Sequence, residues 1–169
     1  MALYLAIPAR KHRRAWVQLK QEFVQDGAAH HALYQGSKTF GQFLRKRRDF
    51  AQGKRLPEGY VPGSKYFLME EGSPKFLGVV TICHREADGH INYAVAPSER
   101  NKGYATEQLR LALEKCREMG IGPVLITCDR ENIASMKVIQ KNGGVLEDER
   151  MTEDGKAFQR YWIDLTTHA

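Results

Sequence analysis

The sequence predicts one α/β domain whose strands and helices follow the order β-α-α-β-β-β-α-β-α-β-β. Three observations lead to this prediction. Short apolar segments with β-branched residues alternate with longer segments whose apolar residues recur at helical spacing. The length of 169 residues suits a single hydrophobic core. No internal repeat, low-complexity segment or linker divides the chain, so residues 1–169 are expected to form a single domain.

The N-terminal part is expected to hold one strand and two helices. Leu3 to Ile7 alternates loosely and is the first strand. From Lys11 to Gln25 the apolar residues recur at helical spacing, and a following Asp-Gly pair ends this helix. A second helix is expected from about Thr39 to Gln52, with phenylalanines on one side and a basic run on the other. Residues 53–63, rich in glycine and proline, form a loop.

The middle of the chain is expected to contain three strands and a long helix. Lys65 to Glu70 and Lys75 to His84 form a hairpin, and His90 to Val95 is the next strand. A strongly amphipathic helix follows from about Gly103 to Met119. Its buried stripe consists of Ala105, Leu109, Ala112 and Cys116.

The C-terminal part is expected to add a buried strand, a helix and a closing hairpin. Val124 to Cys128 is short and apolar, as in a buried strand. The helix from Ile133 to Asn142 begins behind Asn132, a good N-cap, and ends at two glycines. Residues 144–151 and 157–165 are the last two strands.

The segment from Val95 to Leu109 (VAPSERNKGYATEQL) has the properties of an anion-binding turn. The first turn of a helix leaves several backbone N–H groups without partners and carries partial positive charge. Gly103 and Ala105 are small enough for a phosphate to approach that backbone, and Arg100 and Lys102 add full charges. Such a turn alone would suit any phosphate. The sequence lacks both the P-loop and the dinucleotide-binding glycine pattern.

Two motifs resemble those of the GNAT acetyltransferases. Arg100-x-x-Gly103-x-Ala105 is similar to the family's Arg/Gln-x-x-Gly-x-Gly/Ala motif, which grips the pyrophosphate of CoA. Asn132-Ile-Ala-Ser135, followed by a Lys-Asn-Gly-Gly helix end, is similar to its second CoA-side element. The resemblance is strong from about Phe76 to Leu165 and only topological before that. It implies the GNAT fold, a mixed central sheet of about seven strands with helices on both faces, and an acyltransferase that moves an acetyl group from acetyl-CoA to an amine.

The resemblance also implies which residues hold acetyl-CoA. The pantetheine arm would pair with the backbone of the central strand at Tyr93, Ala94 and Val95, where a backbone N–H stabilises the developing oxyanion. The remaining cofactor contacts would come from two helix starts, and no metal takes part. They are Arg100, Asn101, Lys102, Gly103, Tyr104, Ala105, Asn132 and Ser135.

The catalytic residues follow the family pattern less closely. The position at which many members carry an acidic tyrosine holds Ile139 here. The family's base position is His90 or, by a small register shift, Asn92. A neutral imidazole with a pKa near ~6.5 can act as a base, whereas a surface histidine after an Asp-Gly turn is the other interpretation. Proximity and water alone also support direct transfer.

The net charge of +6 and the pI near 9.3 favour an anionic partner. The basic runs at residues 11–14 and 45–48 raise the alternative of a nucleic-acid-binding module. Such runs on amphipathic helices are usually solvated, and no stacking aromatics are interleaved with them, which disfavours nucleic acid. A GNAT-fold protein that binds acyl-CoA without turnover is the second alternative, because Ile139 replaces the expected tyrosine.

The sequence also predicts where the protein is located, the state of its cysteines and the kind of acceptor. The N-terminus lacks the order of a signal peptide, and no run approaches the ~18 apolar residues of a membrane span, so a cytoplasmic protein is expected. Cys83, Cys116 and Cys128 are interpreted as free thiols. His30 and His31 lack the further ligands of a metal site, and a place beside the acceptor pocket is one interpretation of them, implied by the family's helical region. The acceptor, a small amine or a peptide amine, is left open, as are other acyl groups and the oligomeric state, although dimers are common in the family.

Overall fold

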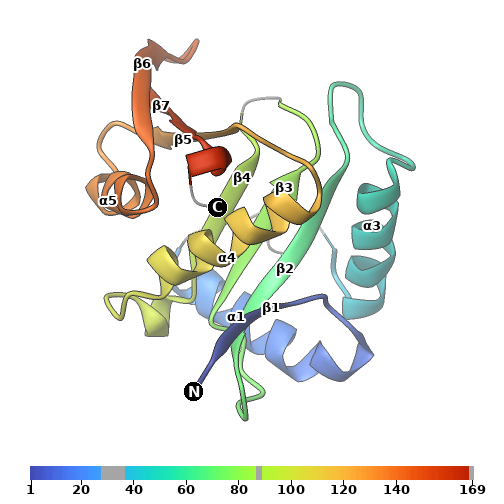
Figure 1. Ribbon diagram of the computed structural model, residues 1–169. Helices are drawn as coiled ribbons and strands as arrows, with labels where there is room; N and C mark the ends of the chain where they lie inside the picture. Colours follow the sequence, from blue (N-terminus) through green and yellow to red (C-terminus); the bar gives the residue numbers. More distant parts are fainter. Residues whose placement is uncertain (28–36, 87–88, 168–169) are drawn as a thin grey trace.

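The computed structural model describes residues 1–27, 37–86 and 89–167. His30 and His31 lie outside the described residues, so their expected position beside the acceptor pocket stays a prediction. Figure 1 shows the arrangement of the elements along the chain. None of the described helices is both long and apolar enough to cross a lipid bilayer.

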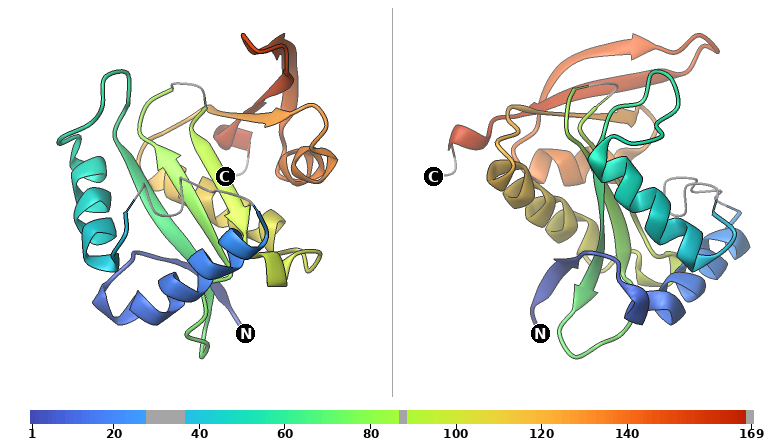
Figure 2. Two further views of the ribbon diagram at one scale, coloured as in Figure 1. Left: turned by 180° about the vertical axis from the view of Figure 1, so that it is seen from behind. Right: turned by 90° about the vertical axis from the view of Figure 1, so that its right-hand side faces the viewer.

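Four strands form the larger sheet. In spatial order they are β1 (Leu3–Ala6), β2 (Gly63–Glu70), β3 (Gly78–Cys83) and β4 (Ile91–Val95), and each neighbouring pair is antiparallel. α1 (Arg13–Gln25) and α3 (Phe40–Gln52) cover one face of this sheet, and α4 (Tyr104–Glu118) covers the other (Figure 2).

Three strands form a second sheet on the β4 side of the first (Figure 1). They are β5 (Val124–Asp129), β6 (Val145–Met151) and β7 (Ala157–Ile163), with β7 between the other two and both pairs antiparallel. α5 (Ile133–Lys141) connects β5 to β6. Three short 3₁₀ turns complete the described elements, at Arg10–His12, Pro97–Glu99 and Leu165–Thr167.

Two hydrophobic cores lie on opposite faces of the larger sheet, because side chains alternate across a strand. One core packs α1 and α3 against the sheet and is aromatic, with Trp16, Phe40, Phe43, Phe67 and Phe76 in mutual ring contact. The other packs α4 against both sheets through aliphatic residues such as Val80, Leu109 and Ile126. The α4 stripe predicted from the sequence belongs to this second core, apart from the less buried Ala105.

Two hydrogen bonds between His90 and Leu125 join the two sheets. The backbone N–H of His90 donates to the carbonyl of Leu125 at 2.8 Å, and the N–H of Leu125 donates to Nδ1 of the His90 ring at 2.9 Å. Beyond this joint β4 pairs with β3 and β5 pairs with β7. The α/β fold class is confirmed, while the single mixed sheet expected from the resemblance is divided into two antiparallel sheets. The division leaves one edge of β4 without a partner strand among the described residues.

Candidate functional site

The open edge of β4 is defined by its hydrogen bonds to β3. The N–H of Cys83 donates to the carbonyl of His90 at 2.6 Å, and the N–H of Ala96 donates to the carbonyl of Leu77 at 2.8 Å. Because the residues of an antiparallel pair alternate between facing the partner strand and facing away, these two bonds fix the pattern between them. The backbone N–H and C=O groups of Ile91, Tyr93 and Val95 therefore point away from β3. In the described chain no strand pairs with them, so this edge can accept an extended ligand.

The start of α4 presents a second set of unpaired backbone donors. Asn101 and Gly103 have positive φ angles of 64° and 82°, which turn the chain sharply before the helix. The first helical bond is from the N–H of Glu107 to the carbonyl of Gly103, at 3.4 Å. Within the described chain the N–H groups of residues 101–106 have no hydrogen-bond acceptor. Successive free N–H groups at a helix start form a binding site for an anion.

Gly103 keeps this turn accessible. Its φ of 82° is a conformation that other residues adopt only with strain. A Cβ atom built at this position would meet no atom within 4 Å, so the backbone there is uncovered. The glycine thus serves both the turn geometry and the close approach of a ligand.

The two cations predicted to add charge here are held by carboxylates. The guanidinium of Arg100 donates to both carboxylate oxygens of Asp26 at the end of α1, at 3.0 and 3.2 Å. Lys102 binds Glu99 at 2.8 Å, and Lys75 binds the same carboxylate at 2.7 Å. These bonds hold the pKa of Glu99 below its usual value. Glu99 balances only one of the two lysines, so these ion pairs fix the loop and leave one positive charge beside the free amides.

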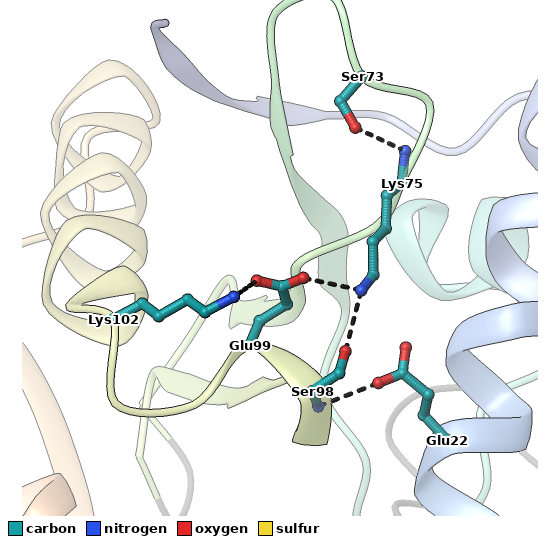
Figure 3. Close-up of polar contacts among 6 residues, drawn as sticks. All are labelled: Glu22, Ser73, Lys75, Ser98, Glu99 and Lys102. Carbon is teal, nitrogen blue, oxygen red and sulfur yellow. Dashed lines mark hydrogen bonds and ion pairs between the residues drawn. The ribbon is translucent and has the colours of Figure 1, made fainter.

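Figure 3 shows how the turn before α4 is anchored to the rest of the molecule. Ser98 donates its backbone N–H to Glu22 of α1 at 3.0 Å and accepts a bond from Lys75 at 2.9 Å. Lys75 lies between β2 and β3, next to Ser73, whose hydroxyl accepts its backbone N–H. Two other parts of the chain, α1 and the segment between β2 and β3, therefore anchor the turn that precedes α4.

α5 begins beside the open edge of β4. The side chain of Asn132 caps the helix by accepting the N–H of Ser135 at 3.1 Å. The hydroxyl of Ser135 lies 2.8 Å from the hydroxyl of Tyr93, so the pair links α5 to β4. Burial raises the pKa of Tyr93 above its ordinary value, although the bond to Ser135 opposes this shift. Two residues predicted from separate motifs thus meet in the structure.

The two proposed base residues differ in position. His90 is 6% exposed, and burial lowers its pKa, with a smaller opposing effect from Glu86. Because Nδ1 accepts the Leu125 N–H, the neutral ring carries its proton on Nε2 and has no free lone pair. His90 therefore holds the joint between the sheets, and its role as a base stays a prediction. Asn92 is exposed on the α1/α3 face of the sheet, beside Thr81.

Ile139 and Gln108 fill the region behind β4. Ile139 is fully buried, and a Cβ atom on Gly144 would come within 2.4 Å of its side chain, so this position serves packing. Gln108, also fully buried, donates from Nε2 to the carbonyl of Ala94 at 3.3 Å. A Cβ atom on Gly78 would collide with the Gln108 side chain and with the Ala94 carbonyl oxygen. Sequence analysis missed Gln108, because a polar residue on an amphipathic helix is normally assigned to the solvent side.

Lys65 is a second residue that sequence analysis missed. It is 3% exposed on β2, and its Nζ donates to the Thr81 hydroxyl at 2.8 Å and lies 5.6 Å from the centre of the Phe50 ring. Burial lowers its pKa from 10.5 to about 8, with Cys83 opposing the shift. Lys65, Thr81 and Asn92 form one row across β2, β3 and β4. The sequence offered one indication of this burial: Lys65 occupies a position of the alternating β2 pattern whose side chains face the core.

An open groove of about 1460 Å³ lies beside α3, and Lys65 is one of the residues that line it. Seven of its fourteen described lining residues are Lys or Arg, and one, Asp49, is acidic. Five of the basic residues come from α3 and the loop that follows it: Arg45, Lys46, Arg48, Lys54 and Arg55. The groove is therefore strongly cationic.

No alternative chemistry based on a metal or a thiolate is supported by the described residues. No group of three or more His, Cys, Asp or Glu side chains among them has the geometry of a metal site. Cys83, Cys116 and Cys128 are free thiols, and burial raises the pKa of each, that of Cys116 to about 12. None is ionised at neutral pH, so none is prepared for nucleophilic attack.

The family Acetyltransferase (GNAT) domain matches the chain over residues 9–145, which include the open β4 edge and the starts of α4 and α5. The chain belongs to the GNAT acetyltransferase family. The match confirms the resemblance and identifies the domain as an acyltransferase. It also includes the N-terminal helices, where the sequence motifs were weakest. No curated protein sequence matches the chain significantly.

Solved structures agree with the GNAT fold. The microcin C7 self-immunity acetyltransferase MccE, in complex with acetyl-CoA and AMP, is 17% identical, with a TM-score of 0.69 over 96% of this chain and 92% of that chain. A Salmonella typhimurium acetyltransferase that modifies the N-terminal serine of a 50S ribosomal protein is 18% identical, with a TM-score of 0.68 over 98% and 96%. A spermidine N-acetyltransferase chimera from Vibrio cholerae and hSSAT is 16% identical, with a TM-score of 0.66 over 99% and 98%. At these identities the likeness is one of fold.

Proposed function

We propose that this GNAT protein transfers an acetyl group from acetyl-CoA directly to a primary amine. The observation that carries the proposal is the open edge of β4 beside the unpaired amides of residues 101–106. These amides bind the diphosphate of CoA, and the backbone of Tyr93 and Val95 pairs with the amide groups of the pantetheine arm. MccE and the Salmonella typhimurium protein yncA, both similar in fold, were crystallised with acetyl-CoA.

The chemical step is a direct displacement. The neutral amine attacks the thioester carbonyl, a C–N bond forms, and the C–S bond then breaks to release CoA thiolate. An outward N–H of β4 donates to the carbonyl oxygen as negative charge develops on it. The amine proton passes to water, because the lone pair of His90 at Nδ1 is already engaged. The cofactor supplies the activated acyl group, and the protein supplies position and hydrogen bonds.

Tyr93 is the proton donor to the departing thiolate in this proposal. Ile139 offers no hydroxyl at the position where many family members have a tyrosine. The Tyr93 hydroxyl lies on the open strand itself and is oriented by Ser135. Because burial raises its pKa, it is protonated at neutral pH. A thiol has a pKa of about 8.5 in water, so the CoA thiolate is a weaker base than the phenolate that Tyr93 becomes. Transfer of the proton from Tyr93 to the thiolate therefore depends on their proximity.

The other parts of the proposal concern partners and location. Solved neighbours include enzymes that act on a ribosomal protein and on spermidine, so the fold accommodates both peptide amines and small amines. The free thiols agree with a reducing compartment, the cytoplasm. A homodimer remains part of the proposal, by analogy with the family.

Release of CoA thiol from acetyl-CoA, measured with a panel of amines, tests the function. The panel contains spermidine, an aminoglycoside, free amino acids and short peptides with an unblocked N-terminus. Turnover with at least one acceptor is expected, accompanied by the mass of the acetylated product. The second candidate, an acyl-CoA-binding protein without turnover, is favoured by Ile139. Saturable binding of acetyl-CoA with no thiol release across the panel would establish that candidate instead.

A further inference from the structure

The groove beside α3 has an excess of positive charge, and its lining residues are not among those proposed to bind CoA. Of its basic residues, Arg55 pairs with the single acidic one, Asp49, at 3.0 Å. Arg45 and Arg48 are exposed on α3 and have no ion-pair partner among the described residues. Like charges held this close repel one another unless an anion lies between them. The groove is therefore complementary to a negatively charged ligand.

Lys65, a buried residue that lines this groove, provides an independent observation. An ammonium group offers three N–H donors, and here one is used by Thr81. No carboxylate among the described residues pairs with it, and burial is the main influence on its ionisation. An ammonium group buried without a counter-charge is costly and is rarely kept for stability alone. Its two remaining donors are suited to a carboxylate or phosphate oxygen.

The row of Lys65, Thr81 and Asn92 connects the groove to the reacting centre. Neighbouring strands are ~4.8 Å apart, so the backbone of Lys65 is about 10 Å from that of β4, where the thioester is proposed to lie. An extended peptide covers ~3.3–3.6 Å per residue, so this distance corresponds to about three residues. A negative group near Lys65 would therefore belong to the second or third residue of a peptide whose terminal amine reaches the thioester.

We infer that the acceptor is an amine carrying carboxylate or phosphate groups within about 10 Å of the reactive nitrogen, held by Lys65 and the basic residues of the α3 groove. This inference rests on the proposed acetyl transfer and specifies its substrate class. A polyamine is the wrong acceptor, because its remaining ammonium groups would face Arg45, Arg48 and Lys65 without compensation. A short acidic peptide and a small phosphorylated amine share the required chemistry.

Matched acceptors in the thiol-release assay test the inference. The tripeptides Ala-Glu-Glu, Ala-Gln-Gln and Ala-Arg-Arg share one amine and differ in charge, and phosphoethanolamine against ethanolamine provides the phosphate arm. The acidic tripeptide or phosphoethanolamine is expected to exceed its uncharged counterpart at least about 10-fold in kcat/KM, and the arm with the larger preference identifies the anion. Raising the salt concentration to about 0.5 M should reduce this preference.

Variants assign the preference to the groove. Lys65→Met, which keeps the length and apolar stem of the side chain, is expected to raise KM for the charged acceptor about 10-fold with kcat nearly unchanged. The double variant Arg45→Gln, Arg48→Gln changes only exposed side chains. It should also raise KM for the charged acceptor. Lys156→Met, an equal charge loss in the exposed β6–β7 turn, is the control and should leave KM unaltered.

The outcomes separate this inference from the proposed function. Turnover of uncharged or cationic amines with no preference for the anionic ones would overturn the acceptor class while the acetyl transfer stands. A fall in kcat at constant KM in Lys65→Met would show that Lys65 handles a proton and does not anchor the acceptor. If no acceptor releases thiol, calorimetric titration with N-acetyl-Ala-Glu-Glu and N-acetyl-Ala-Gln-Gln still decides. Equal binding of the two would overturn the inference.

Discussion

At the scale of single residues, Lys65 is where function and stability oppose each other. The fold lowers its pKa from 10.5 to about 8, so the unfolded state binds a proton more tightly. Between these two values the unfolded state holds more protons, and the free energy of unfolding therefore rises with pH. Below pH 8 the folded protein carries the full cost of the buried charge, on the order of 3 kcal/mol.

Lys65→Met is therefore expected to stabilise the protein at pH 7 by about 1–3 kcal/mol, with the lost bond to Thr81 offsetting part of the gain. The advantage should shrink as the pH rises above 8 and be smallest near pH 10.5. Urea unfolding of the two proteins at pH 7 and pH 10 measures it. A methionine variant that is less stable at pH 7 would mean that Lys65 has a counter-charge in the fold.

Tyr93 gives the second prediction at this scale. Removing its hydroxyl with Tyr93→Phe should lower kcat about 10–100-fold, the usual contribution of a positioned acid, and change KM for acetyl-CoA little. Tyr4→Phe, which removes a hydroxyl on β1 that contacts Met69, is the control and should keep full activity. Steady-state thiol release measures both variants. Wild-type kcat in Tyr93→Phe would exclude Tyr93 as the proton donor.

Some residue roles could be predicted from the sequence and others could not. Gly103 and Asn132 occupy positions whose backbone geometry only a few residue types suit, so their local patterns were informative. Lys65 and the bond between Tyr93 and Ser135 depend on partners 16 and 42 residues away. The ring of His90, which binds Leu125 across the joint, is another such case. Contacts of this kind follow from the tertiary arrangement and leave no periodic signal in the chain.

At the scale of elements, the proposed function makes cofactor binding depend on the start of α4. Its amides are uncovered because Gly103 has a positive φ and no side chain. Gly155 in the β6–β7 turn has nearly the same φ, 84°, and equally open surroundings. The two glycines therefore form a matched pair, equal in backbone strain and different in position.

Gly103→Ala and Gly155→Ala are each expected to cost about 1–2 kcal/mol of unfolding free energy, because alanine is strained at positive φ. Only Gly103→Ala should also raise KM for acetyl-CoA, by about 10-fold or more, since its methyl group lies where the diphosphate approaches. Urea unfolding and steady-state kinetics separate the two effects. An equal KM in both variants would show that the α4 start does not hold the cofactor.

The boundaries of most elements followed from the sequence because their end signals are local. The predicted helix from Thr39 to Gln52 is observed as Phe40–Gln52, with the Thr39 side chain as its cap. The predicted strand from Val124 to Cys128 is observed as Val124–Asp129. The local sequence does not show where β4 and β5 part, because both strands are apolar enough to pair; only the resemblance to the family implied that the strands His90 to Val95 and Val124 to Cys128 splay apart at their ends.

At the scale of the whole molecule, each of the two sheets pairs its own strands in antiparallel fashion, and His90 and Leu125 join them. The outward backbone groups of Ile91, Tyr93 and Val95 on the β4 edge have no partner strand among the described residues. An edge of this kind normally invites pairing with another chain. Here the start of α5 lies beside it through the contact of Ser135 with Tyr93. We therefore predict that an extended ligand, the pantetheine arm, takes the place of a partner strand.

The decisive measurement is calorimetric titration with acetyl-CoA and, for comparison, with acetyl-pantetheine, which lacks the diphosphate. We expect one site per chain with a Kd on the order of 1–100 μM for acetyl-CoA. Acetyl-pantetheine should bind at least about 100-fold more weakly, because the amides of residues 101–106 then have no anion to hold. No heat with acetyl-CoA, or equal affinity for the two compounds, would contradict this prediction.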